Sequence, residues 1–156
     1  MQHLKTPEVE MSDTQVAALD HTIQQTNLWL KKLVEEHHFA DRHQAYNALR
    51  AVLLALRDQL TNEQAAHLSA QLPILIRGIY FEGWHLGNAK SDGRSIEAFA
   101  EHVAKHLPPQ FPRDPKTTTH AVFDLLWKEL DPGLTAKLID GLPAPLRSLW
   151  PAIAGR

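Results

Sequence analysis

The stretch RHQAYNALRAVLLALRDQL, residues 42–60, decides the fold of this chain. Its apolar side chains recur at intervals of 4, 3, 1, 3 and 4 residues, which is one stripe of a helix with 3.6 residues per turn. The stripe consists of Ala45, Leu49, Val52, Leu53, Leu56 and Leu60. Ala51, Leu54 and Ala55 make the segment apolar on nearly all sides. We therefore expect a helix over residues 42–60 at the centre of the molecule.

A second segment matches this one 70 residues later without a gap. The matched pairs include Ala51 and Ala121, Leu56 and Leu126, Leu72–Pro73 and Leu142–Pro143, and Arg77 and Arg147. Similarity at one fixed offset is typical of a duplicated supersecondary unit. The sequence thus predicts two tandem, related helical halves that pack as one compact, bundle-like domain.

The two halves differ at one informative position, where Asp124 in the second half replaces Leu54 of the first. A carboxylate is costly to bury without a partner. We therefore expect the helix over residues 119–130 to lie nearer solvent than the central helix.

Capping residues mark the starts of several helices: Asp41 with Gln44, Thr61 with Gln64, Ser95, and Asp131 before Pro132. Pro73 and Pro143 separate the short helices that follow. Helices are expected over 20–36, 42–60, 62–71, 73–81, 96–106 and 119–130, then from 132 and from 143 to about 150. Because no alternating run is long enough for a sheet, the predicted fold class is all-α.

The domain organisation follows from the repeat and from the connecting segments. We expect a flexible N-terminal leader at 1–14, a first helical half at 15–84, a linker at 85–95, a second half at 96–151 and a C-terminal tail at 152–156. Met11 is an alternative start of the chain. Pro108, Pro109, Pro112 and Pro115 exclude a regular helix across the segment that holds them.

Composition excludes several classes of protein. The 156 residues carry 16 Lys and Arg against 18 Asp and Glu, so the basic excess typical of a nucleic-acid binder is missing. Without cysteine the chain has no disulfide, thiolate zinc site or cysteine nucleophile. Its apolar stretches are far shorter than the roughly 20 residues that span a bilayer. We expect a cytoplasmic protein that binds neither nucleic acid nor membrane.

Two groups among the ten histidines have spacing that a metal ion can use. His102 and His106 are four residues apart on a predicted helix, so both rings can project from one face. His37, His38 and His43 cluster with Asp41 at a corner between two helices. A pair of histidines on a helix surface is more often simply solvated, and the sequence implies no cofactor. These histidines are therefore secondary candidates.

Two further sets of side chains have a structural and a functional interpretation. Arg77 and Arg147 either bind an anion together or, as we favour, hydrogen-bond helix C-termini while their stems cover the core. Tyr80, Phe81 and Trp84 gather near the end of the first half, where adjacent helical positions cannot face one core. They are candidates for an interface, including that of a homodimer.

Several phrases of the sequence resemble the bacterial domain-of-unknown-function family DUF2267. They are DHTIQ at residues 20–24, the segment 41–60, QLP at 71–73 followed by GW at 83–84, and LWP at 149–151. A Leu-Pro-x-x-x-Arg element appears twice, at Leu72–Arg77 and Leu142–Arg147. The resemblance runs from about Leu19 to Pro151. It implies a small, helical, cytoplasmic bacterial protein, and it supplies no catalytic residue, cofactor or substrate.

No motif for catalysis is found. The sequence lacks a Gly-x-Ser-x-Gly elbow and a glycine-rich phosphate loop. The leading prediction is a non-enzymatic interaction or scaffolding module that binds an unknown protein partner. The alternative is a protein that binds a small ligand or a metal, possibly as an enzyme, between the two halves or at the histidine clusters.

Overall fold

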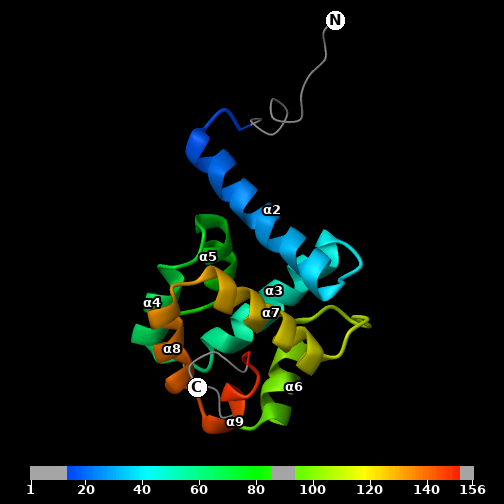
Figure 1. The fold of residues 1–156 in the computed structure, drawn as a ribbon, viewed down its shortest axis with the longest axis vertical. Coiled ribbons are helices and arrows are strands. Elements are labelled where there is room, and N and C mark those ends of the chain that lie inside the picture. The colour runs from blue at the N-terminus through cyan, green and yellow to red at the C-terminus, as the bar shows by residue number, and fades with distance from the viewer. Residues whose placement is uncertain (1–13, 86–93, 152–156) are drawn as a thin grey trace, which may run out of the picture.

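A computed structural model describes residues 14–85 and 94–151, and all regular structure in these two ranges is helical (Figure 1). The elements are α2 (Ala17–His37), α3 (Arg42–Arg57), α4 (Asn62–Ser69), α5 (Ile74–Tyr80), α6 (Ile96–His106), α7 (Pro115–Glu129), α8 (Pro132–Asp140) and α9 (Ala144–Arg147). The predicted all-α class is confirmed. The leader, the tail and most of the linker lie outside the described residues.

The helices begin where the capping residues indicated. The side chains of Asp41, Thr61, Ser95 and Asp131 each accept a hydrogen bond from the backbone N–H three residues later. At Thr61 the cap is reciprocal, because Gln64 accepts a hydrogen bond from the backbone N–H of Thr61. Local side-chain chemistry therefore sets these four starts.

Several expected helix ends were wrong. Helix α2 begins at Ala17 rather than residue 20, and α4 ends at Ser69 rather than residue 71. Helix α7 begins at Pro115 rather than residue 119, because Asp114 accepts a hydrogen bond from the Thr117 N–H and proline is well tolerated in the first helical turn. Helix α3 ends at Arg57, and residues 58–60 continue as turns. Helix α9 contains only four residues, and the chain then turns toward Trp150.

Helix α3 lies at the centre of the fold, as expected, and packs against α2, α5, α6 and α7 (Figure 1). Every side chain from Ala51 to Arg57 is buried. Burial of apolar surface at about 25 cal/mol per Å² is the main favourable term in folding, so this helix anchors the shared core. Asp124 on α7 is about one quarter exposed and paired, in agreement with its expected place nearer solvent.

Positions 70 residues apart share several features. Helices α4 and α8 begin at residues 62 and 132, and α5 and α9 begin at residues 74 and 144. Leu56 and Leu126 have no exposed surface, and Tyr80 and Trp150 are both buried. The duplication itself stays a prediction.

Replacement of Leu53 or Leu56 by Ala tests the position of this core. Because both side chains are fully buried, each change should leave a cavity and lower the free energy of unfolding by about 2–5 kcal/mol. Leu28→Ala is the matched control, since Leu28 is 49% exposed on α2 and should change stability by about 0.5 kcal/mol or less. Urea denaturation measures all three. A core variant as stable as the control would contradict the assignment.

Candidate functional site

The structure brings together the two histidines predicted on one helix face and adds a carboxylate to them. The rings of His102 and His106 on α6 lie edge to face, with centroids 5.3 Å apart. The Nε2 atom of His102 is hydrogen-bonded to Oδ2 of Asp58, the residue that caps the C-terminal end of α3, at 2.8 Å. Asp58, His102 and His106 each offer a ligand atom within 4.8 Å of the other two. We call these three residues the α3–α6 triad.

The sequence analysis did not single out Asp58 as a partner of these histidines. It lies 44 residues before His102, and only the packing of α3 against α6 places the two together. The other carboxylate oxygen of Asp58 accepts a hydrogen bond from Nε of the buried Arg57 at 3.0 Å. Burial and the neighbouring His102 lower the pKa of His106, so its imidazole is neutral at neutral pH.

A second titratable cluster joins α2 to α7. Nε2 of His37 is hydrogen-bonded to Oδ2 of Asp124 at 2.8 Å, and Glu36 lies beside the pair. The ammonium of Lys128 contacts both Asp124 and Glu36, at 3.1 and 3.2 Å. Burial raises the pKa of Asp124, but the hydrogen bonds from His37 and Lys128 outweigh it and the pKa is lowered. This cluster is an ion-pair network in which the Lys128 ammonium supplies the positive charge.

The corner cluster predicted from sequence does not form. His38 and His43 are exposed, Asp41 caps α3, and neither histidine joins a metal-like group among the described residues. His38 ends α2 in the left-handed conformation, with φ 61°. That turn separates its side chain from His37, which faces α7 instead.

Arg77 and Arg147 hydrogen-bond backbone carbonyls at the ends of the preceding helices. Arg77 donates to the Leu72 carbonyl, and Arg147 donates to the carbonyls of Leu142 and Asp140. These contacts fit the structural interpretation of both arginines.

Little solvent-exposed surface is available for an interface at the aromatic group of Tyr80, Phe81 and Trp84. Tyr80 is completely buried and donates a hydrogen bond to the Ala65 carbonyl, so it cannot serve as an interface residue. Phe81 and Trp84 are half-buried against the core, with ring centroids 5.1 Å apart. The exposed apolar surface lies elsewhere in the described chain.

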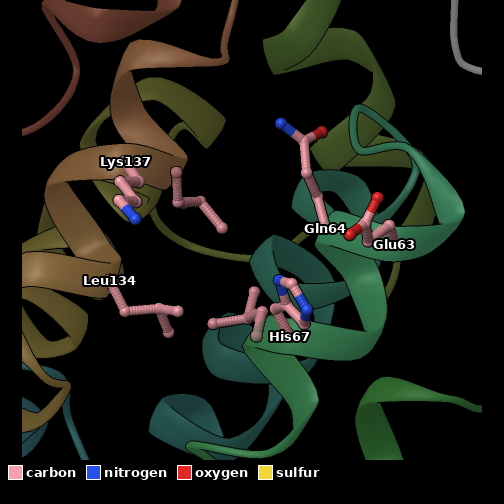
Figure 2. A pocket seen from close by; sticks show the side chains of 7 residues that line it. Glu63, Gln64, His67, Leu134 and Lys137 are labelled. Atoms are coloured by element: carbon pink, nitrogen blue, oxygen red, sulfur yellow. The ribbon is translucent and has the colours of Figure 1, made fainter.

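A shallow pocket lies between α4 of the first half and α8 of the second (Figure 2). Leu68, Leu134 and Leu138 supply apolar walls, while His67 and Lys137 stand at its edge. Its volume of about 250 Å³ falls below the roughly 300–1,000 Å³ usual for small-molecule sites. The pocket lies between the two halves, where the alternative prediction placed a ligand. Its size and its four polar lining side chains, Glu63, Gln64, His67 and Lys137, specify none.

Large apolar side chains are exposed on α2 and α5. Val16 and Leu19 are about half exposed, and Ile23 is 39% exposed. Ile74 and Leu75 at the start of α5 are 63% and 42% exposed. The backbone N–H of Leu75 donates to the Thr22 hydroxyl at 2.9 Å, so α5 starts directly against α2. We call Val16, Leu19, Ile23, Ile74 and Leu75 the α2–α5 face.

In a comparison of the sequence with known families, residues 26–149 match the profile described as "Uncharacterized conserved protein (DUF2267)". The chain belongs to the DUF2267 family. The matched segment holds the helices from α3 to α9, the part of α2 from Thr26 onward and both titratable clusters, whereas Val16, Leu19 and Ile23 precede it. No curated protein matches the chain. In the described part of this DUF2267 chain, no helix is both long and apolar enough to cross a membrane.

The network around Asp124 makes a prediction for the dependence of stability on pH. The folded-state pKa of Asp124 lies below its ordinary value of 3.8, so the stabilisation is fully present above that value and is lost as the pH falls through the folded-state pKa. Asp124→Asn should therefore lower the free energy of unfolding at pH 7, and the difference from the parent protein should shrink in acid.

Urea unfolding at a series of pH values measures this difference, with the exposed Asp140→Asn as the control. The control should track the parent protein across the series. A difference between Asp124→Asn and the parent that stays constant from pH 7 into strong acid would show that the charge of Asp124 contributes nothing.

Proposed function

We propose that this protein is a non-enzymatic helical interaction module in which two copies associate through the α2–α5 face. The observation that supports the proposal is a stripe of mostly apolar side chains that runs along one side of α2. The members of this stripe from Thr26 onward are buried. The members before Thr26 are apolar but exposed.

The stripe has the spacing of a coiled-coil seam. Its members are Val16, Leu19, Ile23, Thr26, Leu30 and Leu33, at alternating intervals of three and four residues. Such a repeat places every member on one side of the helix, where it packs against a partner helix. Thr26, Leu30 and Leu33 are buried in the core. Within the described chain, the three members that precede them are left exposed.

The surroundings favour a second copy as the occupant. Figure 1 shows the first half of α2 extending beyond the rest of the described chain with α5 beside it, which leaves room for a second molecule among the described residues. Asp20 and His21 are the only ionisable residues between Thr14 and Asn27. Asp20 accepts a hydrogen bond from the Thr14 hydroxyl. A two-fold pair therefore brings few like charges together, and the same face serves both partners.

The other parts of the proposal rest on the residues described above. The non-enzymatic part of the proposal is supported by the lack of a catalytic motif in the sequence, and by the ion pairs that engage Asp124 with His37 and Lys128. A cytoplasmic location and lack of nucleic-acid binding agree with the near balance of charge. The matched starts of α4 and α8 support an origin of the two halves by duplication.

Ile23→Asp tests the proposed dimer. A charge at this position should be costly to bury in the interface, so the variant should be monomeric at concentrations where the parent has about twice the 17.6 kDa mass of one chain. Leu28→Asp is the matched control, because Leu28 is 49% exposed on the same helix but lies off the stripe. Light scattering coupled to gel filtration measures the masses.

The control should remain a dimer. A monomeric parent protein at high micromolar concentration would contradict the second copy as occupant. Equal dissociation by both variants would contradict the stripe as the contact.

A further inference from the structure

We propose that the α3–α6 triad is a binding site for a divalent transition-metal ion of the zinc, cobalt or nickel type. The site would be formed by Asp58, His102 and His106, and it would join the end of α3 in the first half to α6 in the second. This inference is independent of the proposed dimer, because the triad and the α2–α5 face share no residue.

The first support is the arrangement of the three ligands. His102 and His106 are separated by one helical turn on α6, and Asp58 reaches them from α3. All three side chains are half-buried, so their positions are restricted by packing. Two imidazoles and one carboxylate form a donor set for zinc and its neighbours, whereas calcium and magnesium prefer oxygen ligands alone.

The second support is a ring nitrogen of His106 that has no hydrogen-bond partner. The Nε2 atom of His106 is buried and makes no hydrogen bond within the described chain. An unsatisfied buried polar atom destabilises the folded state, so such atoms call for a partner.

The third support is the contrast with the cluster of Glu36, His37 and Asp124. There the ammonium of Lys128 already binds both carboxylates, and a single imidazole is present. Two cations lie beside the α3–α6 triad. Arg50 donates to the backbone carbonyl of His106, and Arg57 binds the oxygen of Asp58 that is not bonded to His102. Arg57 thus orients the carboxylate as a supporting residue and leaves the other oxygen for the metal.

Metal binding would require one local change. The 2.8 Å between His102 Nε2 and Asp58 Oδ2 is a hydrogen bond, whereas two ligands of a tetrahedral zinc ion lie about 3.3 Å apart. The side chains must separate by about 0.5 Å, and Nε2 of His102 must give up its hydrogen when the metal enters. A neutral imidazole keeps one N–H, so that proton is then carried on Nδ1 of the same ring, whereas an imidazolium releases one proton to solvent. With three protein ligands, a fourth position stays open to water.

Zinc binding to the full-length, tag-free protein tests the site. Equilibrium dialysis against zinc chloride, followed by elemental analysis, should find one zinc per chain. His106→Gln should reduce this at least tenfold, and because Nε2 of His106 makes no hydrogen bond, the change removes a ligand without breaking one. His37→Gln is the matched control in the other cluster and should retain the zinc.

A measurement on the unaltered protein makes the result independent of how the variants fold. On addition of zinc, the ring signals of His102 and His106 in a proton–carbon NMR spectrum should shift together while those of His37 stay unchanged. Absence of stoichiometric zinc, undiminished zinc in folded His106→Gln, or shifts confined to other histidines would overturn the proposal.

Discussion

Complete burial of the last two turns of α3 is the constraint on which the rest of the structure depends. Because no side of the helix faces water there, its final residue, Arg57, is buried as well, and its guanidinium must find partners inside the protein. It donates to the carbonyls of Tyr80 and Glu82 and to the carboxylate of Asp58. Arg57 thereby fixes the position of the chain after α5. It also orients the Asp58 carboxylate, which is hydrogen-bonded to His102 on α6.

This chain of contacts links the two halves of the molecule. Arg57 orients Asp58, and Asp58 is hydrogen-bonded to His102. A second set of contacts joins α2 to α7, in which His37 is hydrogen-bonded to Asp124 and Glu36 is paired with Lys128. Both connections run between a helix of one half and a helix of the other. The polar contacts thus fix the alignment of the halves, while the apolar core supplies most of the stabilisation.

Local chemistry made much of the fold predictable from the sequence. The stripe through Leu49 and Leu56 identified the central helix, and side-chain caps such as Thr61 placed helix starts to the residue. The start of α7 was misjudged because four nearby prolines were taken as a break, although Pro115 is compatible with the first turn after the Asp114 cap.

The candidate sites were less predictable, because they depend on which helices meet. The spacing of His102 and His106 was visible, but their carboxylate partner lies on another helix, and nothing local in the sequence indicates it. Ile23 has the apolar pattern of a core residue and yet is 39% exposed, because in the first half of α2 the described chain covers only the side that holds Thr22 and Thr26. Periodicity identifies the face of a helix, whereas tertiary packing decides whether that face is covered.

Native-state hydrogen exchange tests the central claim, that α3 is the common core of both halves, most directly. The account predicts that amides from Ala51 to Leu56 exchange only through global unfolding, together with the buried amides of α7, while the first turns of α2 exchange through local opening. Exchange of α3 at a lower free energy than α7, or separate unfolding of the two halves, would contradict a single core built on this helix.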